Sequence, residues 1–95
     1  MCVEALRLSG LGLVNRVVPF EQFESSVNEL IDDILLGAPL SIQATKQASA
    51  RGLDLPLKEA FYGRYPAVQK MMASDDAKEG PKAFAEKRTP LWKGR

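Results

Sequence analysis

FEQFESSVNELIDDILL, residues 20–36, is the stretch that decides the fold class of this chain. Its apolar residues recur every three or four positions, the spacing that places them on one face of an α-helix, and its acids occupy the other face. Gly37 ends the helix and Pro39 prevents it from resuming. The pattern therefore predicts an amphipathic helix. The apolar residues are Phe20, Phe23, Val27, Leu30, Ile31 and Ile34, and the acids are Glu21, Glu24, Glu29, Asp32 and Asp33.

Two further helices are predicted in the middle of the chain. The first covers residues 39–51 or 41–51 and ends at Gly52, and its alanines would allow a neighbouring helix to come close. The second covers residues 56–73 and begins near a proline, a residue favoured in the first helical turn. We expect Pro66 to kink this helix, because proline lacks an amide donor and its ring clashes with the preceding turn.

The last predicted helix has its own start signal. Asp76 and Glu79 have the spacing of a capping box, in which the first carboxylate accepts a backbone amide and the second reaches back to the start of the helix. Gly80 and Pro81 follow, so the helix begins at either Asp76 or Pro81. It is expected to end at Thr89-Pro90, because the residue before a proline disfavours helical geometry.

The segment before these helices is predicted to contain a strand. Residues 12–19, GLVNRVVP, are rich in β-branched residues, nearly apolar, and bounded by glycine and proline. Residues 1–11 are mixed in character, with a break at Ser9-Gly10. The predicted fold class is therefore mainly α, with three or four helices after one short strand, in a single and partial domain over residues 1–95.

Composition excludes several classes of protein. The 95 residues weigh 10.5 kDa, which is one domain or less, and a net charge of +1 gives no general attraction to nucleic acid or membranes. The absence of histidine excludes a Ser-His-Asp triad, a Cys-His pair and a His-ligated metal site. The single cysteine, Cys2, cannot form an internal disulfide. With neither a signal peptide nor a membrane-spanning stretch in the sequence, we expect a cytoplasmic protein.

Candidate catalytic residues are scarce. Asp32 and Asp33 are adjacent, so on a helix their side chains diverge by about 100° and cannot converge on one atom. Asp75 and Asp76 lie where a helix start favours a cap and negative charge. Both pairs are therefore interpreted as structural, and no catalytic residue and no metal ligand is assigned. Trp92, in a polar tail, is a candidate for an interface.

Charge is unevenly distributed along the sequence. Residues 19–37 contain five acids and no base, whereas residues 78–95 contain six bases and two acids. The basic C-terminal segment could attract phosphate or an acidic surface, although a solvated helix face is the commoner explanation. No Gly-rich phosphate loop or nucleic-acid-reading motif accompanies it, so no nucleic-acid partner is expected.

Four motifs follow one another in a characteristic order. They are GLVNRVVP at residues 12–19, APL at 38–40 followed by Lys46, SDDAKEG at 74–80 and AFAEKRTP at 83–90. Together they resemble the C-terminal third of the enoyl-CoA hydratase/isomerase (crotonase) family, and the resemblance covers residues 12–95. Six residues separate Glu4-Ala5 from Gly12, where the family usually has three, so residues 1–11 are expected to be out of register.

The resemblance implies a fold and a chemistry. Family members are α/β proteins with an N-terminal spiral of β-β-α turns and C-terminal helices that cover the active site and build trimers or hexamers. Two backbone amides stabilise a thioester enolate and one or two glutamates move protons. Those groups lie upstream of the matched segment. The resemblance therefore implies a C-terminal assembly part that is catalytically incompetent alone, with residues 20–95 as a helical oligomerisation region.

The resemblance also implies a ligand contact. Phe84 and Lys87 match the Phe and Lys with which the family contacts coenzyme A, often from a neighbouring subunit, and with Ala83 they are predicted to share one helix face. A flat apolar ring beside an ammonium group suits a nucleotide that ends in phosphate. The implied partners are further copies of this chain or family subunits, with a coenzyme A thioester as substrate and no cofactor. The alternative is a stand-alone helical interaction module derived from the family.

Overall fold

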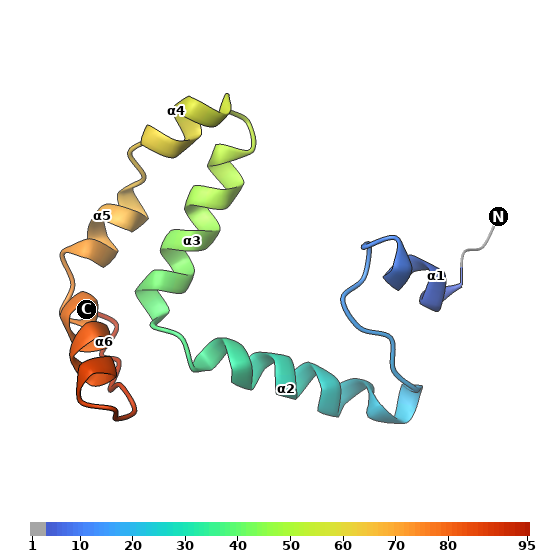
Figure 1. The fold of residues 1–95 in the computed structure, drawn as a ribbon. Coiled ribbons are helices and arrows are strands. Elements are labelled where there is room, and N and C mark those ends of the chain that lie inside the picture. Colours follow the sequence, from blue (N-terminus) through green and yellow to red (C-terminus); the bar gives the residue numbers. More distant parts are fainter. Residues whose placement is uncertain (1–3) are drawn as a thin grey trace. The chain divides into compact units, whose positions relative to one another are not determined.

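The computed structural model of the protein describes residues 4–95, and every regular element in that range is a helix (Figure 1). The elements are α1 (Ala5–Gly10), the 3₁₀ turn η1 (Phe20–Gln22), α2 (Phe23–Leu35), α3 (Pro39–Gly52), α4 (Leu57–Tyr62), α5 (Pro66–Met72) and α6 (Asp76–Ala85). The mainly α fold class is confirmed. The helix predicted over residues 20–36 is present as η1 followed by α2.

The chain divides into two compact units, residues 1–33 and 34–95. In the first unit, Arg16 joins the irregular segment before η1 to α2. Its guanidinium lies 3.4 Å from Glu29 Oε2 and 4.0 Å from Asp33 Oδ2. These groups are exposed, so each ion pair contributes about 0–1 kcal/mol. The acids of α2 are thus partly neutralised within their own unit.

The strand predicted over residues 12–19 is wrong. This segment has no regular secondary structure, and the described part of the chain contains no strand that could pair with it. A β-strand is stable only when a neighbouring strand completes its hydrogen-bond ladder, so a β-like sequence remains irregular when that neighbour is missing.

A short helix, α1, occupies part of the N-terminal segment for which no helix was predicted. It ends in a Schellman motif, in which the Leu13 amide donates to Leu8 O and the Gly12 amide donates to Ser9 O, both at 3.0 Å. Gly12 has φ 77°, a left-handed conformation that glycine adopts without steric cost. The helix therefore ends at Gly10, at the break predicted at Ser9-Gly10, and Gly12 is the left-handed residue that follows its C-cap.

In the second unit, α3 is the central helix and contacts both α4 and α5 (Figure 1). Its predicted range is confirmed, with Pro39 in its first turn. Gln47 on α3 accepts a hydrogen bond at 2.9 Å from the Ala67 amide, one of the free amides at the start of α5. A side chain of α3 thereby caps the start of α5.

The helix predicted over residues 56–73 is two helices. Pro66 begins α5 instead of kinking a continuous helix, and Tyr65 before it is extended, with φ −110° and ψ 118°. A proline pushes the preceding residue out of the helical region, and Gly63 is also extended. The Tyr65 hydroxyl donates to Ala60 O at 2.7 Å and links the break back to α4.

The buried core is small. It contains the apolar residues Ala38, Leu40, Ala44 and Ala83 and the polar residues Ser74 and Asp76. Many large apolar side chains are exposed, including Phe20 (90%), Leu53 (87%) and Phe84 (87%), and the apolar face of α2 is 40–59% exposed. No helix among residues 4–95 is long and apolar enough to span a bilayer. Such extensive apolar exposure is typical of surfaces that other polypeptide covers.

Candidate functional site

The start of α6 is built differently from the predicted capping box. The Ser74 hydroxyl, which is buried, accepts a hydrogen bond from the Ala77 amide at 3.2 Å and donates one to Met71 O at 2.5 Å. Ser74 therefore caps the helix, and the carboxylates of Asp76 and Glu79 make other bonds. The helix begins at Asp76, and Pro81 lies inside it.

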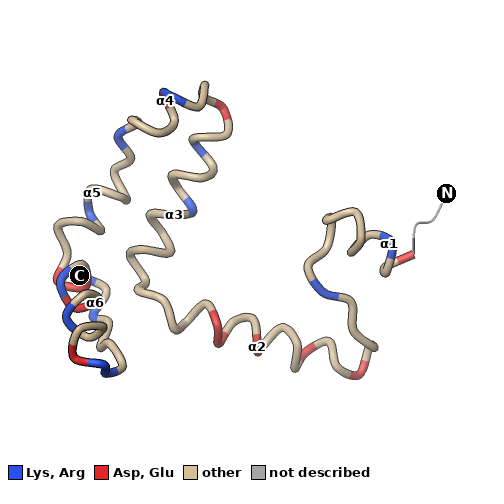
Figure 2. The backbone as a smooth tube through the Cα atoms, in the orientation of Figure 1, with Lys and Arg blue, Asp and Glu red and all other residues tan. Residues whose placement is uncertain are grey.

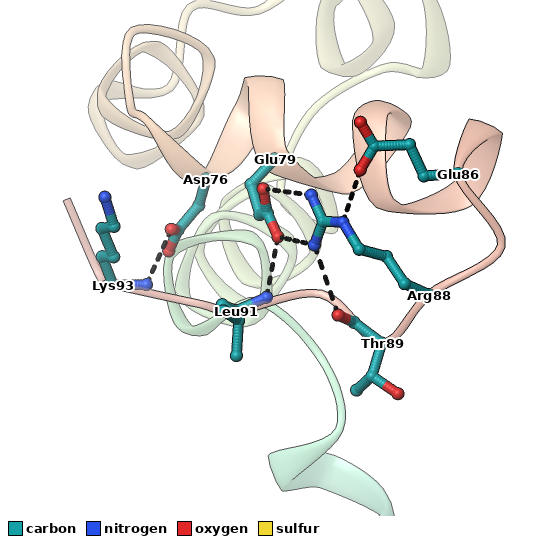
Figure 3. A network of polar contacts seen from close by, with 7 residues as sticks. All are labelled: Asp76, Glu79, Glu86, Arg88, Thr89, Leu91 and Lys93. Atoms are coloured by element: carbon teal, nitrogen blue, oxygen red, sulfur yellow. Dashed lines mark hydrogen bonds and ion pairs between the residues drawn. The ribbon is translucent and has the colours of Figure 1, made fainter.

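Asp76 binds the C-terminal tail, residues 91–95 (Figure 3). Its carboxylate is buried and accepts the amides of Lys93 and Gly94, each at 2.8 Å. The tail also satisfies backbone amides at the start of α6, because the Asp75 and Asp76 amides donate to Arg95 O at 2.8 and 3.3 Å. The tail is thus fixed along the beginning of α6.

Glu79, Glu86, Arg88 and Leu91 form a polar group that we call the Arg88 cluster (Figure 3). Arg88 Nη1 and Nη2 donate to the two carboxylate oxygens of Glu79 at 2.6 and 3.0 Å, and Arg88 Nε donates to Glu86 at 2.5 Å. The Leu91 amide also donates to Glu79, at 2.9 Å. Such bidentate pairing of Arg with a carboxylate restrains geometry more than a single bond does.

The hydrogen bonds from Arg88 and from the Leu91 amide lower the pKa of Glu79 from 4.5 to about 2. The same pairing raises the pKa of Arg88 above its ordinary value. Because the pKa of Glu79 is depressed in the folded chain, the stabilisation is fully present above pH 4.5 and is lost as the pH falls toward 2. The Arg88 cluster is therefore charged and intact at neutral pH.

The end of α6 places Lys87 in an unusual conformation. The Arg88 amide donates to Ala83 O at 3.0 Å and the Lys87 amide donates to Phe84 O at 3.2 Å, which is the Schellman pattern that also ends α1. At α1 the left-handed residue is Gly12, whereas here it is Lys87, with φ 53°. A left-handed conformation costs an L-residue about 1–2 kcal/mol.

The predicted site residues lie close in sequence but do not share a helix face. Phe84 is on α6 and is 87% exposed, Ala83 beside it is 1% exposed, and Lys87 follows the helix end. The prediction that these residues share one helical face is therefore wrong, because α6 ends at Ala85 and not at Thr89-Pro90. Phe84 and Lys87 are nevertheless both exposed, and a cation near a helix C-terminus is favoured by the helix dipole.

Trp92 extends the site toward the start of the second unit. Its Nε1 donates to Leu36 O at 3.0 Å, and a methyl group placed on Gly80 would lie 3.4 Å from its ring. A cavity of about 450 Å³ next to the indole is lined by Leu35, Leu36, Lys87, Arg88, Thr89, Pro90 and Trp92. The cavity therefore combines apolar walls with two cationic side chains.

The sequence model of the enoyl-CoA hydratase/isomerase family matches residues 3–95. The chain belongs to this family. The match begins inside residues 1–11, for which a departure from the family spacing was predicted. Carnitinyl-CoA dehydratase from Salmonella typhi is 43% identical over 99 aligned residues, which cover 97% of this chain and 36% of that protein.

Solved structures of crotonase-family proteins are also similar. An enoyl-CoA hydratase/isomerase from Mycobacterium paratuberculosis matches with a TM-score of 0.90 and 35% identity, over 96% of this chain and 36% of that chain. An enoyl-CoA hydratase from Bacillus anthracis matches with a TM-score of 0.86 and 31% identity, over 96% of this chain and 35% of that one. This crotonase-family chain thus spans about a third of the length of these relatives.

Charge in this crotonase-family chain follows the predicted distribution. Acidic residues lie along α2, and basic residues are frequent in α6 and the C-terminal tail (Figure 2). Several of these charges are paired, since Arg16 lies near Glu29 and Asp33, and Arg88 binds Glu79 and Glu86. One member of each adjacent carboxylate pair has a partner elsewhere in its unit. Asp33 lies near Arg16, and Asp76 binds the tail.

Three contributors to the site were missed in the sequence. Arg88 and the tail amides contact α6 across a turn, and no periodic pattern signals a pair nine residues apart such as Glu79 and Arg88. Ser74 could have been found, because serine three residues before the amide it caps is a common helix-start signal. The capping-box spacing of Asp76 and Glu79 instead predicted the cap at those two residues.

Proposed function

We propose that this chain is the assembly and coenzyme-A-contacting C-terminal part of an enoyl-CoA hydratase/isomerase protein, without catalytic groups of its own. The observation that carries the proposal is the exposed ring of Phe84, whose carbonyl accepts the amide of the left-handed Lys87, at positions where the family resemblance implies a coenzyme A contact. Phe84 would contact the adenine and Lys87 the phosphates.

The chemistry of these side chains supports the contact. An aromatic side chain that remains 87% exposed gains little in water, whereas stacking against a planar base removes apolar surface from solvent. Lys87 adds a mobile point charge for phosphate, and the α6 terminus also favours its positive charge. The Arg88 guanidinium is occupied by Glu79 and Glu86, which leaves Lys87 as the more available cation.

The uncovered apolar surface supports the assembly role. Phe20 of η1 and the apolar face of α2 are exposed at 40–90%, and Leu53, Leu57 and Phe61 are exposed at 79–87%. Association with another polypeptide is an economical way to remove such surface from water. We propose that the partner is a second copy of this chain or a family subunit.

Coenzyme A binding tests the ligand contact. We expect the 95-residue chain to bind coenzyme A weakly, with a dissociation constant of about 1 mM or ~4 kcal/mol, seen as shifts of the Phe84 and Lys87 amide resonances in an NMR titration. Lys87→Gln should weaken binding about tenfold, because it removes a charge-assisted hydrogen bond. Phe84→Ala should weaken binding of both coenzyme A and adenosine, whereas Lys87→Gln should leave adenosine binding unchanged.

Lys70→Gln is the matched control, since it removes one exposed positive charge from α5 and should leave affinity unchanged. Equal affinity of the wild type, Lys87→Gln and Phe84→Ala for coenzyme A would overturn the proposed contact. In that case, retained self-association in sedimentation would favour a stand-alone interaction module.

Activity assays test the proposed lack of catalytic groups. We expect no hydration of a short enoyl-CoA above background by the isolated chain, because the resemblance implies that the enolate-stabilising amides and the glutamates lie upstream. The measurement follows loss of the enoyl thioester absorbance, with protein from a host that lacks hydratases. The Bacillus anthracis enoyl-CoA hydratase serves as positive control. Turnover that follows the chain through purification would show that catalytic groups lie within these residues.

A further inference from the structure

Hydrogen bonds hold the chain in place both before and after Lys87. Before it, α6 ends in two Schellman hydrogen bonds, at 3.0 and 3.2 Å. After it, the next residue, Arg88, returns to α6 and binds both carboxylate oxygens of Glu79, and the Leu91 amide binds the same carboxylate. Arg88 Nη1 also lies 3.4 Å from Thr89 O. The backbone on the far side of Lys87 is thus tied to the helix that precedes it.

We infer that Arg88 is a positioning residue, whose pairing with Glu79 fixes the left-handed conformation of Lys87 and so sets the direction in which the Lys87 ammonium leaves the end of α6. The inference rests on the proposed coenzyme A contact. Arg88 itself is not assigned to the ligand, since its donors are directed to Glu79, Glu86 and Thr89 O.

The backbone of Lys87 explains why such fixing is needed. At the equivalent position of α1 the chain has Gly12, which is left-handed at no steric cost, whereas a lysine favours the right-handed region when nothing restrains it. When only a fraction of the chains hold the binding-competent conformation, the apparent affinity falls by that fraction. The lower end of the left-handed penalty corresponds to a loss of about fivefold.

The positioning role of Arg88 and simple electrostatics predict opposite changes in coenzyme A affinity for Glu79→Gln. Glu79→Gln removes a negative charge from α6, the helix that Lys87 follows, so electrostatics alone would tighten binding of an anionic ligand. Glu79→Gln also removes the carboxylate that binds Arg88 and the Leu91 amide, so positioning predicts weaker binding. The sign of the change therefore separates the two effects.

The experiment is an NMR titration of the full chain with coenzyme A, using wild type, Glu79→Gln, Arg88→Lys and Lys87→Gln. We expect Glu79→Gln and Arg88→Lys to weaken binding about fivefold. Arg88→Lys keeps the charge and loses the two-pronged pairing, so it tests the same geometry if Glu79→Gln fails to fold. In both variants the three-bond HN–Hα coupling of Lys87, which reports its φ, should move toward the right-handed value. Glu59→Gln, an exposed glutamate of α4, is the matched control and should change neither quantity.

The outcomes separate this inference from the proposed function. Weaker binding by Lys87→Gln together with unchanged or tighter binding by Glu79→Gln or Arg88→Lys would overturn the positioning role and leave the coenzyme A contact standing. Binding that is equal in wild type and Lys87→Gln would overturn the contact itself. In that case an unchanged Lys87 coupling in Glu79→Gln and Arg88→Lys would also overturn the conformational role of Arg88.

Discussion

Replacing Ala44 by aspartate is expected to unfold the second unit, residues 34–95. Ala44 is 2% exposed on α3, the helix that contacts both α4 and α5. A carboxylate placed there would be buried without a partner, which costs about 3–5 kcal/mol. Small single domains have only about 5–15 kcal/mol of stability, and the apolar core of this chain is small. Far-UV circular dichroism should show a large loss of helix and of the cooperative thermal transition.

Ala50→Asp is the control for this substitution. Ala50 lies on the same helix but is exposed, so the same chemical change should lower stability by no more than about 1 kcal/mol through helix propensity and the C-terminal dipole. A chain with Ala44→Asp that melts like Ala50→Asp would show that α3 is not packed as described.

Removing the Asp76 side chain is expected to release the C-terminal tail. The carboxylate is 3% exposed and accepts the amides of Lys93 and Gly94 at 2.8 Å. Asp76→Ala removes two charge-assisted hydrogen bonds and should destabilise the folded chain by about 2–4 kcal/mol. Hydrogen exchange of these two amides should accelerate. Emission from Trp92 should shift to the red, since its bond to Leu36 O depends on the tail.

Asp75→Ala is the matched control, because Asp75 is the adjacent acid and its side chain makes no cap hydrogen bond. Its substitution should change stability by less than about 1 kcal/mol and leave tail exchange unchanged. Slow exchange of the Lys93 and Gly94 amides in Asp76→Ala would contradict the assigned bonds.

Helix periodicity predicted most of the fold. The apolar spacing over residues 20–36 and the glycine and proline signals around 39–52 gave helices that the structure confirms. Prediction from the local sequence was wrong where the structure of a segment depends on residues outside it. Residues 12–19 have strand propensity, yet a strand also needs a neighbour, and the described chain supplies none. Pro66 was identified as disruptive, but Gly63 and extended Tyr65 turned the expected kink into a break.

The site was predicted only in part, because several of its contacts join residues that are distant in the sequence. Phe84 and Lys87 were selected through the family resemblance, and both are exposed near the end of α6. Asp76 and Glu79 were recognised as important for the start of α6, but their partners were assigned locally. Their actual partners, the tail amides and Arg88, lie nine or more residues away. A capping rule considers only one helical turn, so it could not find them.

The left-handed Lys87 also bears on how this protein should be engineered. Programmes that search for thermostabilising substitutions would choose glycine at position 87, as the chain itself has at Gly12, for a gain of about 1 kcal/mol. That substitution would raise thermal stability but would remove the Lys87 ammonium group that is proposed to contact phosphate. Residue 87 should therefore be kept fixed in any such redesign.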